Sequence, residues 1–134
     1  YKDAVSLSND RTRVAFHGAA SAADIFGYEI YLVNIDGTGL VALTNNSILD
    51  GHPAWANDDS RLVYASLRDT AFSLILVEPN GTEIANLSPM GANDNDPEYL
   101  PDGRITFKTQ RFSASPEARI AIMDGDGGNV QQLT

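Results

Sequence analysis

The sequence predicts an all-β protein built as a β-propeller segment, with three four-stranded antiparallel blades. Three observations support this prediction. A short strand, a polar turn and an apolar strand recur three times. A further strand with an Asp-Gly or Asn-Gly turn follows each copy. The copies end at Thr44, Ser88 and Thr134. The spacing between these ends is the repeat length of a four-stranded propeller blade.

The clearest copy covers residues 52–66. Pro53 has no backbone N–H, so it belongs near a strand start and not inside a ladder. Residues 57–60 are turn formers whose side chains bond their own backbone. Residues 62–65 form an apolar run bounded by turn signals, which predicts a strand covered on both faces.

The other two copies vary this pattern. Upstream, Leu7 takes the place of the aromatic residue that ends the first strand; downstream, the turn at residues 101–103 is one residue shorter. Each second half contains a turn of the hairpin type that tolerates positive φ, namely Asp36–Gly37, Asn80–Gly81 and Asp126–Gly127.

The expected strands follow in order along the chain. They are residues 3–8, 13–18, 29–34 and 40–44 in the first blade, 52–56, 61–66, 72–78 and 84–87 in the second, and 96–100, 104–109, 119–123 and 130–134 in the third. The blades then cover residues 1–44, 45–88 and 89–134.

An insertion at residues 19–27 lengthens the connection between the second and third strands of the first blade. Loops of this kind are where propellers vary and where partners dock. Ile25 and Phe26 are the residues expected to anchor a partner if their side chains are exposed. An ordinary long hairpin loop is the alternative.

Taken together, these features resemble the TolB-type β-propeller repeat over essentially the whole chain. The resemblance rests on Pro-Ala-Trp at residues 53–55, the polar turn, the apolar strand, the Asp-Gly turn and the closing Leu-Thr. The usual Ser-Pro-Asp-Gly turn is degraded at residues 9–11, 57–59 and 101–103. The resemblance implies a six-bladed ring, of which this chain is half. Bacterial members are commonly exported to the periplasm or beyond and bind proteins, whereas others belong to peptidases or are sugar-acid lyases.

Composition narrows the functional classes. The net charge of −9 and the scatter of only nine basic residues argue against nucleic acid as a partner. No run of about 18 apolar residues occurs, so no membrane span is expected. There are no cysteines, so a disulfide framework is excluded. The chain starts at Tyr1 without a signal peptide or an initiator methionine, which suggests a processed or partial chain.

Catalytic motifs are scarce. The chain contains only two histidines, His17 and His52, and has neither a Gly-x-Ser-x-Gly elbow nor a cysteine nucleophile. Residues 124–129 resemble a calcium loop, but Asn129 stands where glycine is expected, and alignment with the other two Asp-Gly turns favours a hairpin. A non-enzyme without a cofactor is therefore predicted, and a bound Ca²⁺ is the alternative.

The loops that cross from one blade to the next are better site candidates. Asp50 and His52 in one repeat align with Asp94 and Asp96 in the next. In propellers this segment lines one mouth of the central channel, where carboxylates would bind a cation or a basic peptide segment. The alternative is that these residues cap loops and keep a strand edge soluble.

Three blades leave an open arc. Both end faces are expected to be apolar and to need neighbours. Two copies pairing into a six-bladed ring, further blades, or a larger assembly would cover them. The sequence thus predicts a non-catalytic module for protein–protein interaction or assembly. The alternatives are the propeller domain of a larger hydrolase, peptidase or sugar-acid lyase, and a structural subunit of an extracellular assembly.

Overall fold

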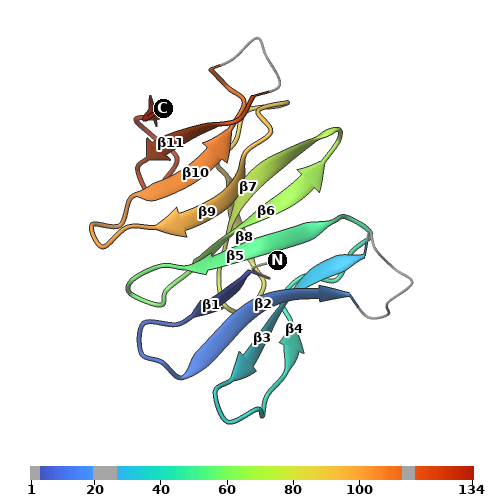
Figure 1. The fold of residues 1–134 in the computed structure, drawn as a ribbon. Helices are drawn as coiled ribbons and strands as arrows, with labels where there is room; N and C mark the ends of the chain where they lie inside the picture. Colours follow the sequence, from blue (N-terminus) through green and yellow to red (C-terminus); the bar gives the residue numbers. More distant parts are fainter. Residues whose placement is uncertain (1–3, 20–26, 113–116) are drawn as a thin grey trace.

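A computed structural model describes residues 4–19, 27–112 and 117–134. It contains three four-stranded antiparallel sheets, each built from strands in chain order (Figure 1). The first sheet holds β1 (Val5–Leu7), β2 (Arg13–Ala19), β3 (Tyr28–Asn34) and β4 (Val41–Ala42). The second holds β5 (Asp50–Trp55), β6 (Leu62–Arg68), β7 (Ala71–Val77) and β8 (Glu83–Asn86). The third holds β9 (Asn95–Tyr99), β10 (Ile105–Thr109), β11 (Arg119–Met123) and β12 (Gln131–Gln132).

This architecture confirms the predicted all-β fold with three four-stranded blades. The prediction of β5 was wrong at its start, because the strand begins at Asp50 and not at His52. A β-bulge makes the longer strand possible: the register shifts between Gly51 and Ala54, and His52 has a φ of 54°. Pro53 is tolerated there because bulges and edge strands leave a backbone N–H unneeded.

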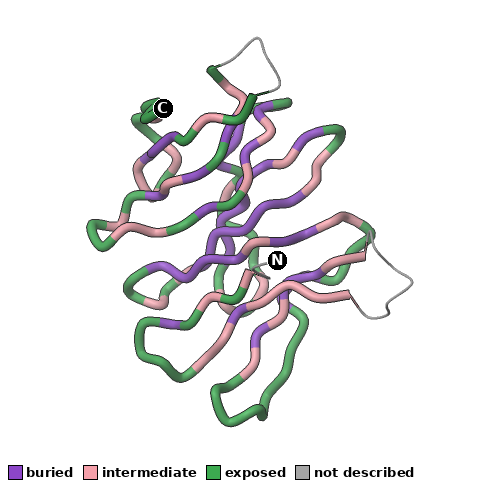
Figure 2. Tube along the Cα trace, in the orientation of Figure 1, coloured by how far each residue is buried: buried purple, intermediate pink, exposed green. Residues whose placement is uncertain are grey.

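We call the three sheets blades 1, 2 and 3 in chain order. Blade 2 lies between the other two blades, and both of its faces are covered (Figure 2). The four residues Leu62, Val63, Tyr64 and Ala65 are at most 4% exposed, as the continuous apolar run predicted. We call the contact between blades 1 and 2 the 1–2 interface, and the contact between blades 2 and 3 the 2–3 interface. Each interface contains an apolar core. The 1–2 core consists of Ala15, Ile30, Leu32, Leu43, Trp55, Leu62, Tyr64, Ile75 and Val77. The 2–3 core consists of Ala54, Val63, Ala65, Leu74, Leu76, Leu87, Ile105, Phe107, Ala121 and Met123.

The three blades share one strand register, so equivalent positions can be compared directly. Leu7 pairs with Val14 as Trp55 pairs with Leu62 and as Tyr99 pairs with Ile105. Because side chains alternate across a strand, each blade turns one set of residues toward the blade before it and the other set toward the blade after it.

The two free faces of the arc differ. That of blade 1 is apolar: Val5 is 64% and Leu7 47% exposed, and the rings of Phe16 and Tyr31 stack at 5.6 Å. That of blade 3 is mixed, because its pleat presents Glu98, Thr106, Lys108 and Ile120. The expectation of two apolar end faces was therefore wrong for blade 3, where polar side chains stand at positions that are aliphatic in blade 2.

Candidate functional site

Of the predicted channel-mouth residues, Asp50 and His52 lie on β5 and Asp96 lies on β9, whereas Asp94 precedes β9 in the crossing loop. His52 Nδ1 lies 2.9 Å from Asp96 Oδ1, and Lys108 Nζ lies 3.8 Å from Asp96 Oδ2. The backbone N–H of His52 donates to His17 Nδ1 at 3.2 Å. His52 and Asp96 thus meet at the rim of a depression of about 220 Å³. Both residues have positive φ, 54° and 50°, a conformation that is uncommon outside glycine.

Asp50 lies inside the molecule, with no exposed surface. Its Oδ1 accepts a hydrogen bond from Ser66 Oγ at 2.6 Å, and its Oδ2 accepts one from Asn46 Nδ2 at 2.9 Å. The backbone N–H of Asn46 also donates to Glu29 Oε1 at 2.7 Å. Glu29 is 7% exposed, and its Oε2 has no hydrogen-bond partner. This crossing loop therefore joins two buried carboxylates through neutral donors.

Asp94, the equivalent residue in the next crossing loop, is also fully buried. Arg111 donates to both of its oxygens, with Nε at 3.1 Å from Oδ1 and 2.9 Å from Oδ2. Ser88 Oγ donates to Asp94 Oδ2 at 2.6 Å. The structure thus brings His52 and Asp96 together at the surface and places Asp50 and Asp94 in the interior, so partner binding by this set stays a prediction.

The remaining sequence-based candidates divide into two groups. Ile25 and Phe26 lie outside the described residues. Residues 124–129 form the β11–β12 hairpin turn, in which the Gly127 N–H donates to Asp124 O at 2.9 Å. Among the described residues, no group of three or more His, Cys, Asp or Glu side chains is arranged to hold a metal ion. The same residues contain no helix able to cross a bilayer.

The opposite end of each interface holds the hairpin turns. At the 1–2 interface, Asp59 of blade 2 accepts two hydrogen bonds from blade 1, from the Asn9 N–H at 2.6 Å and the Asp10 N–H at 2.9 Å. The Arg13 guanidinium lies over the Trp55 ring, 4.6 Å from its centroid. A carboxylate and a cation–π contact therefore close this end.

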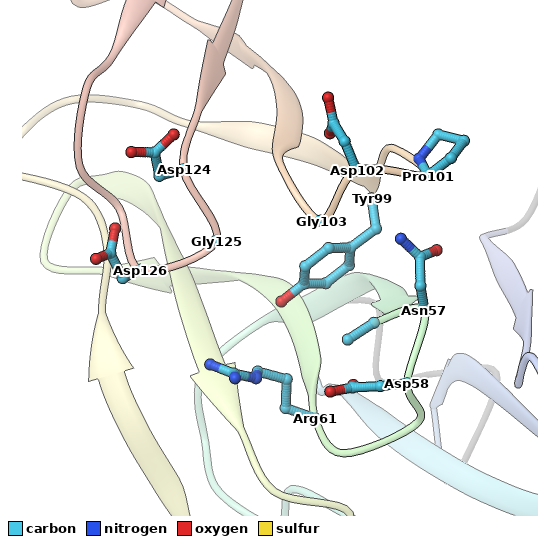
Figure 3. A pocket seen from close by; sticks show the side chains of 11 residues that line it. Asn57, Asp58, Arg61, Tyr99, Pro101, Asp102, Gly103, Asp124, Gly125 and Asp126 are labelled. Atoms are coloured by element: carbon cyan, nitrogen blue, oxygen red, sulfur yellow. The ribbon is translucent and has the colours of Figure 1, made fainter.

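At the 2–3 interface the same end is an open cleft of about 520 Å³ (Figure 3). Arg61 and Tyr99 occupy the positions of Arg13 and Trp55. The lining residues are Ala56, Asn57, Asp58, Arg61, Tyr99, Pro101, Asp102, Gly103, Asp124, Gly125 and Asp126. One direct bond crosses between the turns, from Asn57 Nδ2 to Leu100 O at 2.5 Å.

The electrostatics of the cleft follow from its burial and its turns. Burial raises the pKa of Tyr99 to about 12, and its hydroxyl has no hydrogen-bond partner. The Ser60 hydroxyl and backbone N–H hold the pKa of Asp58 below its usual value. Arg104 does the same for the pKa of Asp102. Four carboxylates thus line the cleft: Arg104 pairs with that of Asp102, and Arg61 is the one guanidinium among the lining residues.

Sequence reasoning missed this cleft. The shortened turn at residues 101–103, which forms part of the lining, was visible in the sequence. Its consequence depends on which blade the turn meets, which the sequence pattern alone does not give.

Comparison with known proteins places the fold. No protein-family model matches the chain. The Tol-Pal system protein TolB of Desulfosudis oleivorans is 28% identical over 123 residues, which are 92% of this chain and 26% of that protein. Dipeptidyl-peptidase 5 of Porphyromonas endodontalis is 26% identical over 98 residues, which are 73% of this chain and 14% of the peptidase. The chain therefore spans about a quarter of the length of the Desulfosudis TolB and a smaller share of the peptidase.

Solved structures show the same architecture. A TolB structure from Agrobacterium tumefaciens superposes with a TM-score of 0.83 and 22% identity, covering 96% of this chain and 47% of the other. TolB from Acinetobacter baumannii gives a TM-score of 0.81 and 24% identity, with 99% and 32% coverage. An oligogalacturonate lyase in complex with manganese gives 0.70 and 17%, with 97% and 40% coverage. The shared fold therefore extends to TolB structures and to a lyase.

Proposed function

We propose that this chain, which carries the TolB-like β-propeller repeat in three copies, is a non-catalytic module for protein–protein interaction and assembly. The observation that carries the proposal is the apolar free face of blade 1. Protein surfaces of this kind are usually covered by another protein surface.

The repeat indicates what covers that face. Leu7, Val14 and Phe16 stand where blade 2 has Trp55, Leu62 and Tyr64. These three blade-2 residues are at most 5% exposed because blade 1 packs on them. The free face of blade 1 thus has the composition of a blade-packing surface, and the proposed occupant is a further blade or a blade of a second copy.

The test is the mass of the chain in solution, measured by light scattering during size exclusion. We expect the wild-type chain to self-associate and Phe16→Lys to dissociate it, because a lysine cannot be buried there without a partner charge. Ile120→Lys, on the mixed face of blade 3, is the matched control and should leave the mass unchanged. A wild-type chain that stays monomeric at all concentrations, with Phe16→Lys indistinguishable from it, would contradict the proposal.

A second candidate is the propeller domain of a larger peptidase or sugar-acid lyase, with catalysis elsewhere. The dipeptidyl-peptidase and oligogalacturonate lyase relatives favour it. Under either candidate, the chain itself should not turn over dipeptide or oligogalacturonate substrates, and measurable turnover would overturn the non-catalytic assignment. The resemblance to exported propellers supports a periplasmic or extracellular place of action.

A further inference from the structure

We propose that the cleft between blades 2 and 3 binds a carboxylate carried by a peptide segment of a partner protein, with a basic group beside that carboxylate. The inference rests on the proposed interaction role only in taking a protein segment as the ligand. Its evidence comes from a comparison within the molecule.

The 1–2 interface already contains such a carboxylate. Asp59 binds the consecutive N–H groups of Asn9 and Asp10, in the first turn of blade 1. Two adjacent N–H groups in a turn form a small anion-binding concavity. In this interface, the bound anion belongs to the chain itself.

Blade 2 presents the same turn to blade 3. The Asp59 N–H donates to Ala56 O at 3.0 Å, just as the Arg11 N–H donates to Ser8 O at 2.9 Å. By this register, Asn57 and Asp58 are the equivalents of Asn9 and Asp10. Neither the Asn57 N–H nor the Asp58 N–H donates to another residue within the described part of the chain, although the Asp58 N–H lies close to the carboxylate of Asp58 itself.

Blade 3 lacks the carboxylate that would fill the site. The Gly103 N–H donates to Leu100 O at 2.9 Å, so Gly103 stands at the position of Asp59. Both residues have positive φ, 86° and 57°. A Cβ added at Gly103 would meet nothing within 4 Å. The space that Asp59 occupies in one interface is therefore open in the other.

Two further groups suit a carboxylate. Within the described residues, the Arg61 guanidinium makes only one long hydrogen bond, from Nε to Ser60 Oγ at 3.5 Å. The Tyr99 hydroxyl is buried without a partner (Figure 3). A carboxylate can accept hydrogen bonds from all of these groups: the guanidinium, the phenol and the two backbone N–H groups.

The other wall of the cleft sets the second requirement. Asp102, Asp124 and Asp126 line it; Asp102 is paired with the Arg104 guanidinium at 2.7 Å, whereas Asp124 and Asp126 accept hydrogen bonds within their own turn and form no ion pair among the described residues. The negative charges of Asp124 and Asp126 oppose an isolated anion, so the ligand must bring a positive charge next to its carboxylate. An acidic side chain followed closely by Lys or Arg meets both requirements.

The test is an NMR titration of the ¹⁵N-labelled chain with three blocked peptides. These are acetyl-Asp-Gly-Lys-amide, the same peptide with Asn in place of Asp, and the same peptide with norleucine in place of Lys. We expect the first peptide to shift the amide signals of Asn57 and Asp58. The other two should bind at least about tenfold more weakly, because each loses one charged partner.

Gly103→Asp supplies the missing carboxylate from the chain itself. This variant should shift the Asn57 and Asp58 signals without any peptide and should no longer bind the first peptide. Gly37→Asp is the matched control, since Gly37 also has positive φ, 84°, and nothing within 4 Å of its added Cβ. It should bind like the wild type.

Three outcomes would overturn the site: no saturable shift of the two amides, equal binding of the Asn peptide, or wild-type binding by Gly103→Asp. Assembly through blade 1 is read separately from the solution mass. The cleft can therefore fail while the proposed function stands, and the reverse result is equally readable.

Discussion

The 1–2 and 2–3 interfaces are built from the same repeat but are fastened at opposite ends. At the turn end, the 1–2 interface has the Asp59 carboxylate and the contact of Arg13 with Trp55, whereas the 2–3 interface is open. At the crossing end, the 2–3 interface has the Asp94–Arg111 ion pair.

At that same crossing end of the 1–2 interface, the donors to Asp50 among the described residues are neutral, namely Asn46 and Ser66. The residue equivalent to Arg111 is Arg68, and it pairs with Glu83 at 2.7 Å instead. Both interfaces thus share an apolar core, whereas charged side chains hold each interface together at one end only: the turn end of the 1–2 interface and the crossing end of the 2–3 interface. The unfastened end is where a repeat can acquire a binding role.

The largest difference is expected at the two buried aspartates. Asp94→Asn leaves the Arg111 guanidinium, whose side chain is 12% exposed, without its counter-charge. We expect a loss of about 3–5 kcal/mol in the free energy of unfolding. Asp50→Asn, which removes no ion pair, should cost only about 1–3 kcal/mol. Urea unfolding of both variants measures this, and equal losses would mean that the two crossing ends do not differ.

A smaller effect is expected at the turn end. Asp59→Ala removes two hydrogen bonds between blades and should cost about 1–2 kcal/mol. Asp69→Ala is the control for backbone strain, because Asp59 and Asp69 have φ values of 57° and 58°. The difference between the two variants in urea unfolding isolates the contact between blades. If the two losses are the same, Asp59 does not fasten the interface.

The cation–π contact is expected to contribute less. Arg13→Gln should lower the free energy of unfolding by about 0.5–1 kcal/mol and change the fluorescence of Trp55, the single tryptophan. Arg61→Gln, the equivalent change beside Tyr99, should leave that emission unaltered. A Trp55 spectrum that is insensitive to Arg13→Gln would remove this contact from the comparison.

The protonation of the two buried tyrosines affects the free energy of unfolding at high pH but not at neutral pH. Burial raises the pKa of Tyr99 to about 12 and raises the pKa of Tyr64 further. The folded state therefore holds each phenol proton more tightly than the unfolded state does. The contribution of these tyrosines to the free energy of unfolding is fully present below about pH 10 and is lost as the pH rises through the folded pKa values. Tyr99→Phe should reduce this fall in unfolding measured between pH 9 and 12; an unchanged pH profile would contradict the assignment.

Much of the fold was predictable because the information is local and repeated. Apolar runs and turn residues located the strands of the repeat. The aromatic residues that end the first strand of two copies pack between blades: Trp55 is 5% exposed within the 1–2 core, and Tyr99 packs on the 2–3 core. These contacts follow the period-two pattern because alternate residues of a strand point to opposite faces of the blade.

The candidate site was less predictable, because it depends on where side chains meet. His52 and Asp96 come together through bulges that no sequence pattern announced. Asp50 and Asp94 turn inward because each accepts hydrogen bonds from a residue on another segment. The cleft required a comparison of two turns that lie in different blades. Only the three-dimensional register made that comparison possible.

The outer strands β4 and β12, with two residues each, have a consequence for solubility. A strand at the rim of a sheet exposes unpaired N–H and C=O groups that can template the growth of a fibril. Two residues offer too short a template for a stable added strand, although apolar side chains such as Val41 are exposed there. We therefore expect β4 and β12 to resist amyloid-like pairing along the rim.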